Sequence, residues 1–359
     1  MRRTSALIVG GGPAGSATAI SLAQAGAMPV LVERSLGERD VVCGGFLGWD
    51  ALAALERLGV DVEALGARPI HRLRLVAGRQ IVESELPHAA AGLSRRRLDS
   101  TLLLMAADSG AVILRGRSVR ALEERRARLD DEEEIEADAI FLATGKHELR
   151  GAARSIGTRS TSVGLRTALP ANIDLNRALA GTVELHLYDD GYAGLLVQED
   201  GAVNLCLSTS RARMAEAGTR SALLDRIIEQ CPLLGDRLAA SPPGEWEAIA
   251  GVPYGWSESS GAPGFFRVGD QAAVVASLVG DGIAIALASA QSAAHYYLGG
   301  GAEAAVSYQP EFARKARFSL AVAERLRRAA EGRFRRRLLV RLAAFPGLAA
   351  AAAKWTRIS

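Results

Sequence analysis

The residues with the clearest chemical potential are three glycines and an acid near the start of the chain. Gly10, Gly12 and Gly15 form a G-x-G-x-x-G pattern within ALIVGGGPAGSATAISLAQAGAMPVLVER, and Glu33 follows the last apolar run of that stretch. The first glycine of such a pattern allows a tight turn, the second lets backbone approach a pyrophosphate, and the third lets a helix pack on a strand. An acid about twenty residues further on can accept hydrogen bonds from ribose hydroxyls. The pattern predicts a dinucleotide site.

A complete strand–helix–strand unit must position these residues. The apolar run from Ala6 to Val9 predicts a strand, the alanine-rich segment after it predicts a helix that ends near Gly26, and the run from Pro29 to Val32 predicts a second strand. Phosphates would bind at the helix N-terminus, where free N–H groups and the helix dipole favour anions. The unit suits both NAD and FAD, so the choice between them depends on the rest of the chain.

A second stretch, CGGFLG at residues 43 to 48, follows this unit. Gly44 and Gly45 lack a Cβ atom, so backbone at this point could approach a planar ring closely. Cys43 could fill space as a small buried thiol or could take part in chemistry. Trp49, which comes next, could belong to the core or to a substrate wall.

Composition and charge exclude several classes of protein. The 359 residues are 49% hydrophobic and 23% charged, as in a compact globular chain of about two domains. A net charge of +3 is too small to favour nucleic acid as a partner. The three cysteines and five histidines lack metal-ligand spacing, so we expect no metal site, no disulfide framework and a reducing cytoplasm. No uncharged run is long enough to predict a transmembrane helix.

Three later segments predict further α/β elements. RRRLDSTLLLMAADSGAVIL predicts a helix followed by a strand from Val112, and IFLATG predicts a buried strand that ends at Thr144. GFFRVGD predicts a strand that ends in Gly269 and Asp270, and a long alanine-rich helix begins at Gly282.

In this order the segments resemble the p-hydroxybenzoate hydroxylase-type superfamily of FAD-dependent oxidoreductases, which includes aromatic monooxygenases, geranylgeranyl reductases and flavin-dependent halogenases. The resemblance extends over residues 6–297 and is most specific at the first glycine-rich unit, at 268–270 and at 280–283. It implies an α/β fold: a Rossmann-like FAD-binding domain with an inserted antiparallel-sheet substrate domain and a C-terminal helical segment. The expected FAD-binding domain comprises residues 1–68, 93–160 and 262–300, the substrate domain 69–92 and 161–261, and the helical region 301–359.

The resemblance also assigns FAD contacts. Asp270 would bond the ribityl chain, the helix from Gly282 would direct its N-terminus at the flavin, and the Cys-Gly-Gly loop would pass the isoalloxazine ring. Arg97 matches an arginine that contacts FAD, with Arg95 and Arg96 as rivals. The predicted cofactor contacts are Gly10, Gly12, Pro13, Ala14, Gly15, Glu33, Arg34, Cys43, Gly44, Gly45, Arg97, Val119 (beside the adenine), Ala143, Thr144, Gly145, Gly269, Asp270, Gly280, Gly282 and Ile283.

The middle of the chain predicts the sheet that would cover a pocket at the flavin. Period-two apolar residues in GTVELHLYDDGYAGLLVQEDGAVNLCLSTS, with Asp-Gly turns between them, predict an antiparallel meander. Because the inward candidates are apolar, we expect a hydrophobic aromatic, polyketide or isoprenoid-like substrate. The predicted pocket contacts are Trp49, His186, Tyr188 and Tyr192, and the candidates for a catalytic role are Cys43 and Tyr192.

Departures from the family patterns bear on the reaction. The halogenase Trp-x-Trp signature is missing, and Thr144, Gly145, Lys146 and His147 stand where NADPH-dependent hydroxylases carry Asp-Gly. Electrons could therefore come from NAD(P)H or from a separate flavin or ferredoxin reductase, and we interpret Lys146 and His147 as a solvated turn. We expect a monooxygenase that uses a flavin C4a-hydroperoxide. The alternatives are a geranylgeranyl reductase-like reduction of carbon–carbon double bonds and a non-catalytic flavin electron-transfer or binding protein.

The C-terminal segment interleaves arginine with apolar residues at helical spacing. Arg333, Arg335 to Arg337 and Arg341 stand among Leu338, Leu339 and other apolar residues. We expect the apolar face to pack on the protein's own pocket or on a partner, and peripheral contact with anionic lipid is the alternative.

Overall fold

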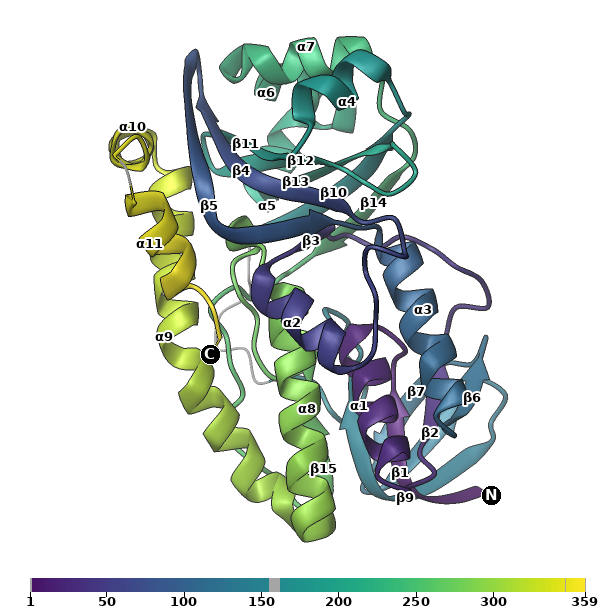
Figure 1. Cartoon of the computed structure of the whole chain (residues 1–359). Coiled ribbons are helices and arrows are strands. Elements are labelled where there is room, and N and C mark those ends of the chain that lie inside the picture. Colours follow the sequence, from purple (N-terminus) through teal and green to yellow (C-terminus); the bar gives the residue numbers. More distant parts are fainter. Residues whose placement is uncertain (1, 155–161, 346, 359) are drawn as a thin grey trace.

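In the computed structural model, which describes residues 2–154, 162–345 and 347–358, the chain forms two sheets linked by helices (Figure 1). The first sheet has the order β6-β2-β1-β9-β8-β7, and β15 also pairs with β9. Its strands are β1 (Arg2–Val9), β2 (Val30–Glu33), β6 (Val112–Arg115), β7 (Val119–Glu123), β8 (Arg126–Leu129), β9 (Glu134–Leu142) and β15 (Phe265–Arg267). The strands β6, β2, β1, β9 and β15 pair in parallel, as the glycine-rich unit predicts.

Four helices pack into the core on one side of this sheet. They are α1 (Pro13–Gln24), α2 (Trp49–Arg57), α3 (Arg95–Asp108) and α8 (Gly282–Gly300), and α2 among them lies against α8. Ala17 of α1 and Ala290 of α8 are fully buried in the main core, together with the stacked rings of Phe141 and Phe266. Because alanine places only a methyl group between two helices, the axes of α8 and α1 can approach closely. The N-terminus of α8 then lies near that of α1.

The second sheet has the order β14-β10-β13-β12-β11-β4-β5-β3. Its strands are β3 (Phe46–Leu47), β4 (Arg68–Ala77), β5 (Gln80–Gly92), β10 (Ser162–Leu169), β11 (Thr182–Tyr188), β12 (Gly191–Val197), β13 (Val203–Ser210) and β14 (Trp246–Ala250). The pairs described in this sheet are antiparallel except β4 with β11, which is parallel. β11 reaches its place beside β4 from β10 of the same sheet through α4. The outer face is covered by α4 (Ile173–Leu179), α5 (Arg211–Ala217), α6 (Arg220–Gln230) and α7 (Pro232–Ala240).

The C-terminal helices connect the two sheets. Figure 1 shows α9 (Ala305–Glu331) running from the end of α8 up to α10 (Arg333–Ala343), which lies beside β5, and α11 (Leu348–Trp355) follows it. Among the described helices none is by itself long and apolar enough to span a membrane, and α10 and α11 pass that test only as a pair bent by 111°. The predicted α/β fold, with an inserted second sheet and a helical C-terminal region, is confirmed.

Arg357 anchors the end of the chain on the first domain. Its guanidinium lies 4.2 Å from the centre of the Trp49 ring, forms an ion pair with Asp281 and approaches the Asp50 carboxylate to 3.6 Å. Asp281 is 1% exposed, so its charge depends on this partner. Burial raises the pKa of Asp50, although the charge of Arg357 opposes that rise.

We therefore expect Arg357→Gln to lower the free energy of unfolding by about 3–5 kcal/mol, because it leaves two carboxylates in a dry site without a cation. Urea titration followed by circular dichroism measures this change. Lys354→Gln, which alters an exposed cation one turn earlier, should change stability by less than about 0.5 kcal/mol. Equal losses in the two variants would contradict the assigned role of Arg357.

Candidate active site

A cavity of about 980 Å³ lies between the two sheets. One end is formed by the turn between β1 and α1, by Glu33 and by Val119. The other end lies under β4, β11 and β12 and reaches α10 and α11. The cavity therefore joins the predicted dinucleotide site to the inner face of the second sheet.

The turn from β1 to α1 is shaped by glycines. Gly10 has φ +108°, and a Cβ atom on it would lie 2.5 Å from the carbonyl oxygen of Ala143. A Cβ atom on Gly15 would overlap the carbonyl oxygen of Gly10, so Gly15 packs behind the turn and does not line the cavity. Gly12 precedes α1 with Pro13 at its first position, which leaves the helix N-terminus open toward the cavity.

Glu33 fixes the approach to this turn. Its carboxylate oxygens accept hydrogen bonds from the backbone N–H groups of Gly11 at 2.7 Å and Ser35 at 2.8 Å. A carboxylate has about four lone-pair sites, so two acceptor positions stay free for hydroxyl groups that enter the cavity.

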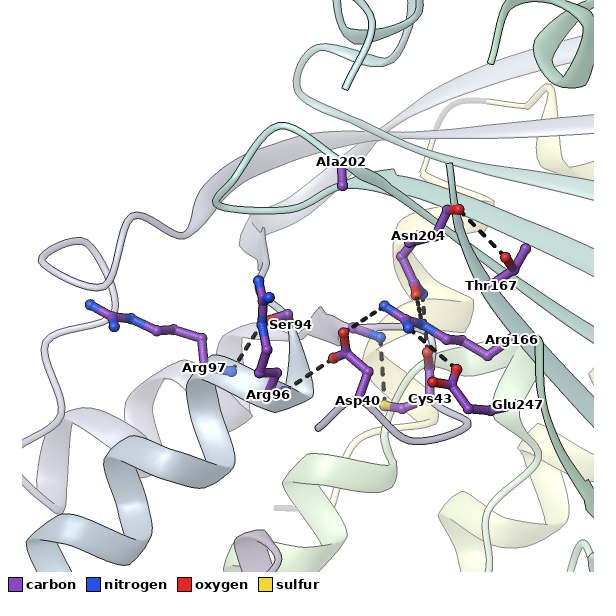
Figure 2. Close-up of polar contacts among 12 residues, drawn as sticks. Asp40, Cys43, Ser94, Arg96, Arg97, Arg166, Thr167, Ala202, Asn204 and Glu247 are labelled. Atoms are coloured by element: carbon purple, nitrogen blue, oxygen red, sulfur yellow. Dashed lines mark hydrogen bonds and ion pairs between the residues drawn. The ribbon is translucent and has the colours of Figure 1, made fainter. Parts of the chain in front are cut away.

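The arginine beside the glycine turn is Arg95, and Arg97 does not reach the cavity. Ser94 caps α3 by accepting the N–H of Arg97, so α3 begins at Arg95 and directs that side chain toward Gly12. Arg95 is held by Asp99 at 2.6 Å, and Arg96 also lines the cavity. Arg97 is exposed and points away from the residues drawn in Figure 2, so its prediction as a cofactor contact is wrong. The cause is the start of the helix: α3 begins at Arg95, so Arg97 lies within its first turn and not ahead of the helix.

The Cys-Gly-Gly loop is tied to the second sheet by a side chain that the sequence did not reveal. The Nδ2 group of Asn204 on β13 donates to the carbonyl oxygens of Cys43 at 3.0 Å and Gly44 at 2.8 Å (Figure 2). Buried Arg166 supports it, because its guanidinium donates to Asn204 at 2.7 Å and to Asp40 at 2.8 Å. The loop is thereby held along the cavity.

The two glycines of this loop differ in their surroundings. Gly45 is buried with φ +71°, and a Cβ atom on it would lie 3.0 Å from Gln198 and 3.1 Å from the carbonyl oxygen of Leu93. Gly44 lines the cavity, and a Cβ atom on it would meet no atom within 4 Å. The loop therefore has open space beside Gly44, as a planar ring requires.

Lys146 and Asp270 form an ion pair in the cavity, with 3.1 Å between Nζ and Oδ2. The Asp270 carboxylate raises the pKa of Lys146 above its ordinary value, although burial acts against this. The turn predicted at Lys146 is present, but its ammonium group is directed at Asp270 and not into solvent. His147 bonds Arg34, with 2.8 Å between its ring nitrogen and the guanidinium. Asp270 and Arg34 are among the residues that the family resemblance assigns to FAD, and Asp270 is the one assigned to its ribityl chain.

The N-terminus of α8 closes the other side of this region. Gly280 has φ +76°, and a Cβ atom there would lie 2.6 Å from the ring of Phe46. Gly282 and Ile283 begin α8 and line the cavity. Of the predicted cofactor contacts, the following line the cavity: Gly10, Gly12, Pro13, Ala14, Glu33, Arg34, Cys43, Gly44, Gly45, Val119, Ala143, Thr144, Gly145, Gly269, Asp270, Gly280, Gly282 and Ile283.

The substrate end of the cavity is apolar. Its walls include Leu73 and Leu75 of β4 together with Val183, Leu185 and Leu187 of β11. The strand alternation that directs these three β11 residues inward directs Glu184, His186 and Tyr188 to the opposite face.

Three of the four predicted pocket contacts are therefore misplaced. Buried His186 bonds Glu184, and Tyr188 donates its hydroxyl hydrogen to the carbonyl oxygen of Ser208 at 2.9 Å, both under α4 to α7. Trp49 packs against Arg357 and His88 outside the cavity. Only Tyr192 lines the cavity as predicted.

Tyr192 belongs to a chain of hydroxyl groups that the sequence did not reveal. Its hydroxyl contacts the Oγ atom of Ser277, which also bonds the Tyr254 hydroxyl at 2.7 Å. All three residues line the cavity. Burial raises the pKa of Tyr192 well above 10 and also raises the pKa of Tyr254. Both phenols are therefore neutral at physiological pH and carry a hydroxyl hydrogen.

The buried charge cluster behind the sheet sets a pH dependence of stability. Glu184 accepts from Arg74 at 2.6 Å, from Arg237 at 3.0 Å and bonds His186 at 2.9 Å. Burial alone would raise the pKa of Glu184, but these hydrogen bonds outweigh it and lower the pKa. A carboxyl with a lowered pKa in the folded state stabilises the fold above its unfolded pKa of about 4.3 and ceases to do so as the pH falls.

We expect Glu184→Gln to lower the free energy of unfolding by about 3–5 kcal/mol at pH 7, because two arginines lose their buried counter-ion. The difference from the wild type should narrow as the pH falls below about 4. Urea titrations at several pH values measure both effects. Glu83→Gln, which removes the half-exposed second partner of Arg74, should cost less than about 1 kcal/mol. A loss that does not change with pH would contradict the assigned ionisation.

Taken together, the residues present fit a flavin dinucleotide. Free N–H groups at α1 and the cationic Arg95 suit a pyrophosphate, and Glu33 suits a ribose. The open side of Gly44 faces space for a ring. The N-terminus of α8 supplies a positive end to the same region.

Comparison with known proteins gives sequence relatives over most of the chain. The model of the family described as pyridine nucleotide-disulphide oxidoreductase matches residues 4–163. Menaquinone reductase from Mycolicibacterium smegmatis is 30% identical over 328 residues, which cover 83% of this chain and 77% of that protein. Digeranylgeranylglycerophospholipid reductase 2 from Methanopyrus kandleri is 26% identical over 298 residues, which cover 77% of this chain and 72% of that protein.

Solved structures show the same fold. A geranylgeranyl bacteriochlorophyll reductase-like protein from Thermoplasma acidophilum has a TM-score of 0.78 at 17% identity, covering 100% of this chain and 94% of that one. PqsL from Pseudomonas aeruginosa, a probable FAD-dependent monooxygenase, has a TM-score of 0.73 at 18% identity, covering 94% of this chain and 99% of that one. At these identities the likeness concerns the fold.

Proposed function

This chain belongs to the family of FAD-dependent oxidoreductases that includes the menaquinone reductase of Mycolicibacterium smegmatis, and from that premise we propose that it saturates a carbon–carbon double bond in an apolar, isoprenoid-like substrate. Its cofactor is FAD, as the family resemblance implies. The observation that carries the proposal is the lining of the substrate end of the cavity. Apolar side chains of β4 and β11 form its walls, and the hydroxyl group of Tyr192 lies among them in contact with Ser277.

Saturation of a double bond adds a hydride to one carbon and a proton to the other. Bound FAD supplies the hydride, and the protein must supply the proton and exclude water. The Tyr192 hydroxyl, which is protonated at physiological pH, donates the proton. Ser277 and the partly exposed Tyr254 return a proton from solvent to it along the hydroxyl chain. Leu185 and Leu187 hold an apolar chain against this group without offering it a hydrogen bond.

The names of the sequence relatives support reduction over oxygen insertion. One is a menaquinone reductase and the other a digeranylgeranylglycerophospholipid reductase, and both names join an isoprenoid compound with reduction. Oxygen insertion, which the family resemblance favours, is the second candidate because the apolar walls of the cavity also suit the exclusion of water that oxygen transfer needs.

Electrons for either reaction must come from a donor. The chain has no second G-x-G-x-x-G segment, and Lys146 is paired with Asp270 where hydroxylases of this fold carry Asp-Gly. We propose NAD(P)H or a separate flavin or ferredoxin reductase as that donor. Stopped-flow reduction with NADPH, compared with a reduced ferredoxin, distinguishes the two sources.

The test uses the FAD-loaded protein, reduced with dithionite under nitrogen and mixed with menaquinone or a geranylgeranyl lipid. Reduction of a carbon–carbon double bond predicts a product that is heavier by two hydrogen atoms, without oxygen, and that keeps this mass after any quinone ring has been reoxidised in air. A product that forms only in air and has gained an oxygen atom would support the second candidate instead. Reoxidation that no apolar compound affects would indicate a non-catalytic flavin protein.

A further inference from the structure

The outer face of α10 carries two parallel strips of side chains. Phe334, Leu338 and Leu342, each four residues apart, are 82%, 59% and 43% exposed and form the apolar strip. The exposed cations Arg333, Arg337 and Arg341 precede them by one residue each and form the basic strip. At about 100° per residue, the two strips lie side by side on one surface of the helix.

Exposed apolar side chains are also present at the start and end of α11, which is bent by 111° from α10. Phe345, Leu348 and Trp355 are 61%, 47% and 59% exposed, and Lys354 is exposed beside them. Residues 332–359 contain seven cationic residues and no Asp or Glu, whereas the whole chain has 43 Lys and Arg against 40 Asp and Glu. The rest of the chain therefore has an excess of acid. Arg336 and Arg357 pair with carboxylates, and the other five cations of this segment are exposed.

The inner face of α10 is held against the protein. Arg336 forms an ion pair with Asp189 at 2.9 Å, and Ser84 of β5 donates its hydroxyl hydrogen to the carbonyl oxygen of Ala343 at 2.9 Å. Val340 is fully buried, and Leu339 lines the cavity. The segment therefore packs on the protein through one face of α10, as expected, and its apolar and basic strips stay exposed.

Two residues connect the exposed surface with the cavity. Leu342 and Leu348 line the cavity and are also 43% and 47% exposed. They lie at the end of α10 and the start of α11, where Figure 1 shows the two helices meeting beside β5. The apolar surface is therefore continuous with the apolar end of the cavity at these two side chains.

We infer that the outer face of α10 and α11 docks on a lipid bilayer with anionic headgroups, so that the cavity opens toward the acyl chains. Side chains such as Phe334 and Trp355 can enter the boundary between headgroups and acyl chains, while arginine side chains reach back to the phosphates. Each cation at such a surface adds attraction to anionic lipid. A second copy of this chain fits poorly, because a symmetric contact would face the basic strips with no acid opposite them.

The docking test measures sedimentation of the FAD-loaded protein with vesicles of phosphatidylcholine, alone or mixed with phosphatidylglycerol. We expect the protein to sediment with the mixed vesicles. Arg333→Gln, Arg337→Gln and Arg341→Gln together should weaken this binding by about fivefold per arginine, or about a hundredfold. Phe334→Ser and Leu338→Ser should each weaken it about tenfold. None of these five side chains lines the cavity.

The matched control lies on α9, which also exposes cations beside a large apolar side chain. Lys315→Gln with Arg317→Gln, or Phe318→Ser at a side chain that is 62% exposed, should change vesicle binding by less than about twofold. Wild-type protein that stays in solution with both vesicle types would overturn the inference. A loss of binding in the control variants as large as in the α10 variants, or a dimer that the α10 variants abolish, would overturn it as well.

The delivery of substrate from the bilayer rests on the proposed function, whereas the docking does not. Turnover is therefore measured with the apolar substrate in detergent and in mixed vesicles. In detergent, we expect the α10 variants to turn over substrate at the wild-type rate. In mixed vesicles, we expect their turnover to fall by about the same factor as their vesicle binding. Vesicle binding without turnover in either medium would reject the reaction and leave the docking surface standing.

Discussion

Gly10→Ala should yield a protein that loses FAD during purification. At φ +108° an alanine is strained, and its Cβ atom would lie 2.5 Å from the carbonyl oxygen of Ala143. The turn must shift to relieve this contact, and the N–H groups at the start of α1 then no longer face the pyrophosphate. We expect FAD affinity to fall by about a hundredfold, which corresponds to about 3 kcal/mol. Fluorescence titration of the reconstituted apoprotein with FAD measures the affinity.

Two control variants separate the causes of this loss. Gly37 also lines the cavity, but its φ is not positive and a Cβ atom there would meet no atom within 4 Å, so Gly37→Ala should retain FAD. Gly110 has φ +107° in open space far from the turn, so Gly110→Ala should cost stability alone. Wild-type FAD affinity in the Gly10→Ala variant would refute the assigned pyrophosphate turn.

Tyr192→Phe should lower kcat for double-bond reduction by about 10²- to 10⁴-fold, the usual contribution of a positioned proton donor. Reduction of the flavin by dithionite should proceed at the wild-type rate, because the substitution leaves the glycine turn and the Cys-Gly-Gly loop unchanged. Since burial raises the pKa of Tyr192 well above 10, the phenol stays protonated, and the wild-type rate should not fall between about pH 6 and 9 through its ionisation. Single-turnover kinetics with the reduced protein separate these steps.

Tyr188→Phe is the matched control, because Tyr188 ends β11 and Tyr192 is the second residue of β12, across one hairpin turn. Its hydroxyl bonds the Ser208 carbonyl behind the sheet, so its loss should cost about 1 kcal/mol of stability and leave kcat unchanged. A Tyr192→Phe variant with the wild-type kcat would show that the proton comes from elsewhere, with Cys43 as the next group to substitute.

Local sequence determined the dinucleotide half of the site. The strand, the glycine turn and the helix at residues 6–24 are contiguous, and their backbone requirements appear directly as residue types. The predicted residues from Gly10 to Glu33, other than Gly15, which packs behind the turn, line the cavity for this reason. Arg97 was misassigned because the choice among three adjacent arginines depends on where α3 begins, and that start is set by the Ser94 cap.

The tertiary structure decided the substrate half. Alternation along β11 is visible in the sequence, but both of its faces are buried, one by α4 to α7 and one by the cavity, so hydrophobicity could not show which face holds the substrate. Tyr188 and His186 were assigned to the wrong face for this reason. Contacts between distant segments, such as Asn204 with Cys43 and Lys146 with Asp270, follow no local period and arise only when the two sheets close on each other. The C-terminal helices show the same division. The sequence shows that they are amphipathic, whereas their packing against β5 decides which face is buried and which is exposed.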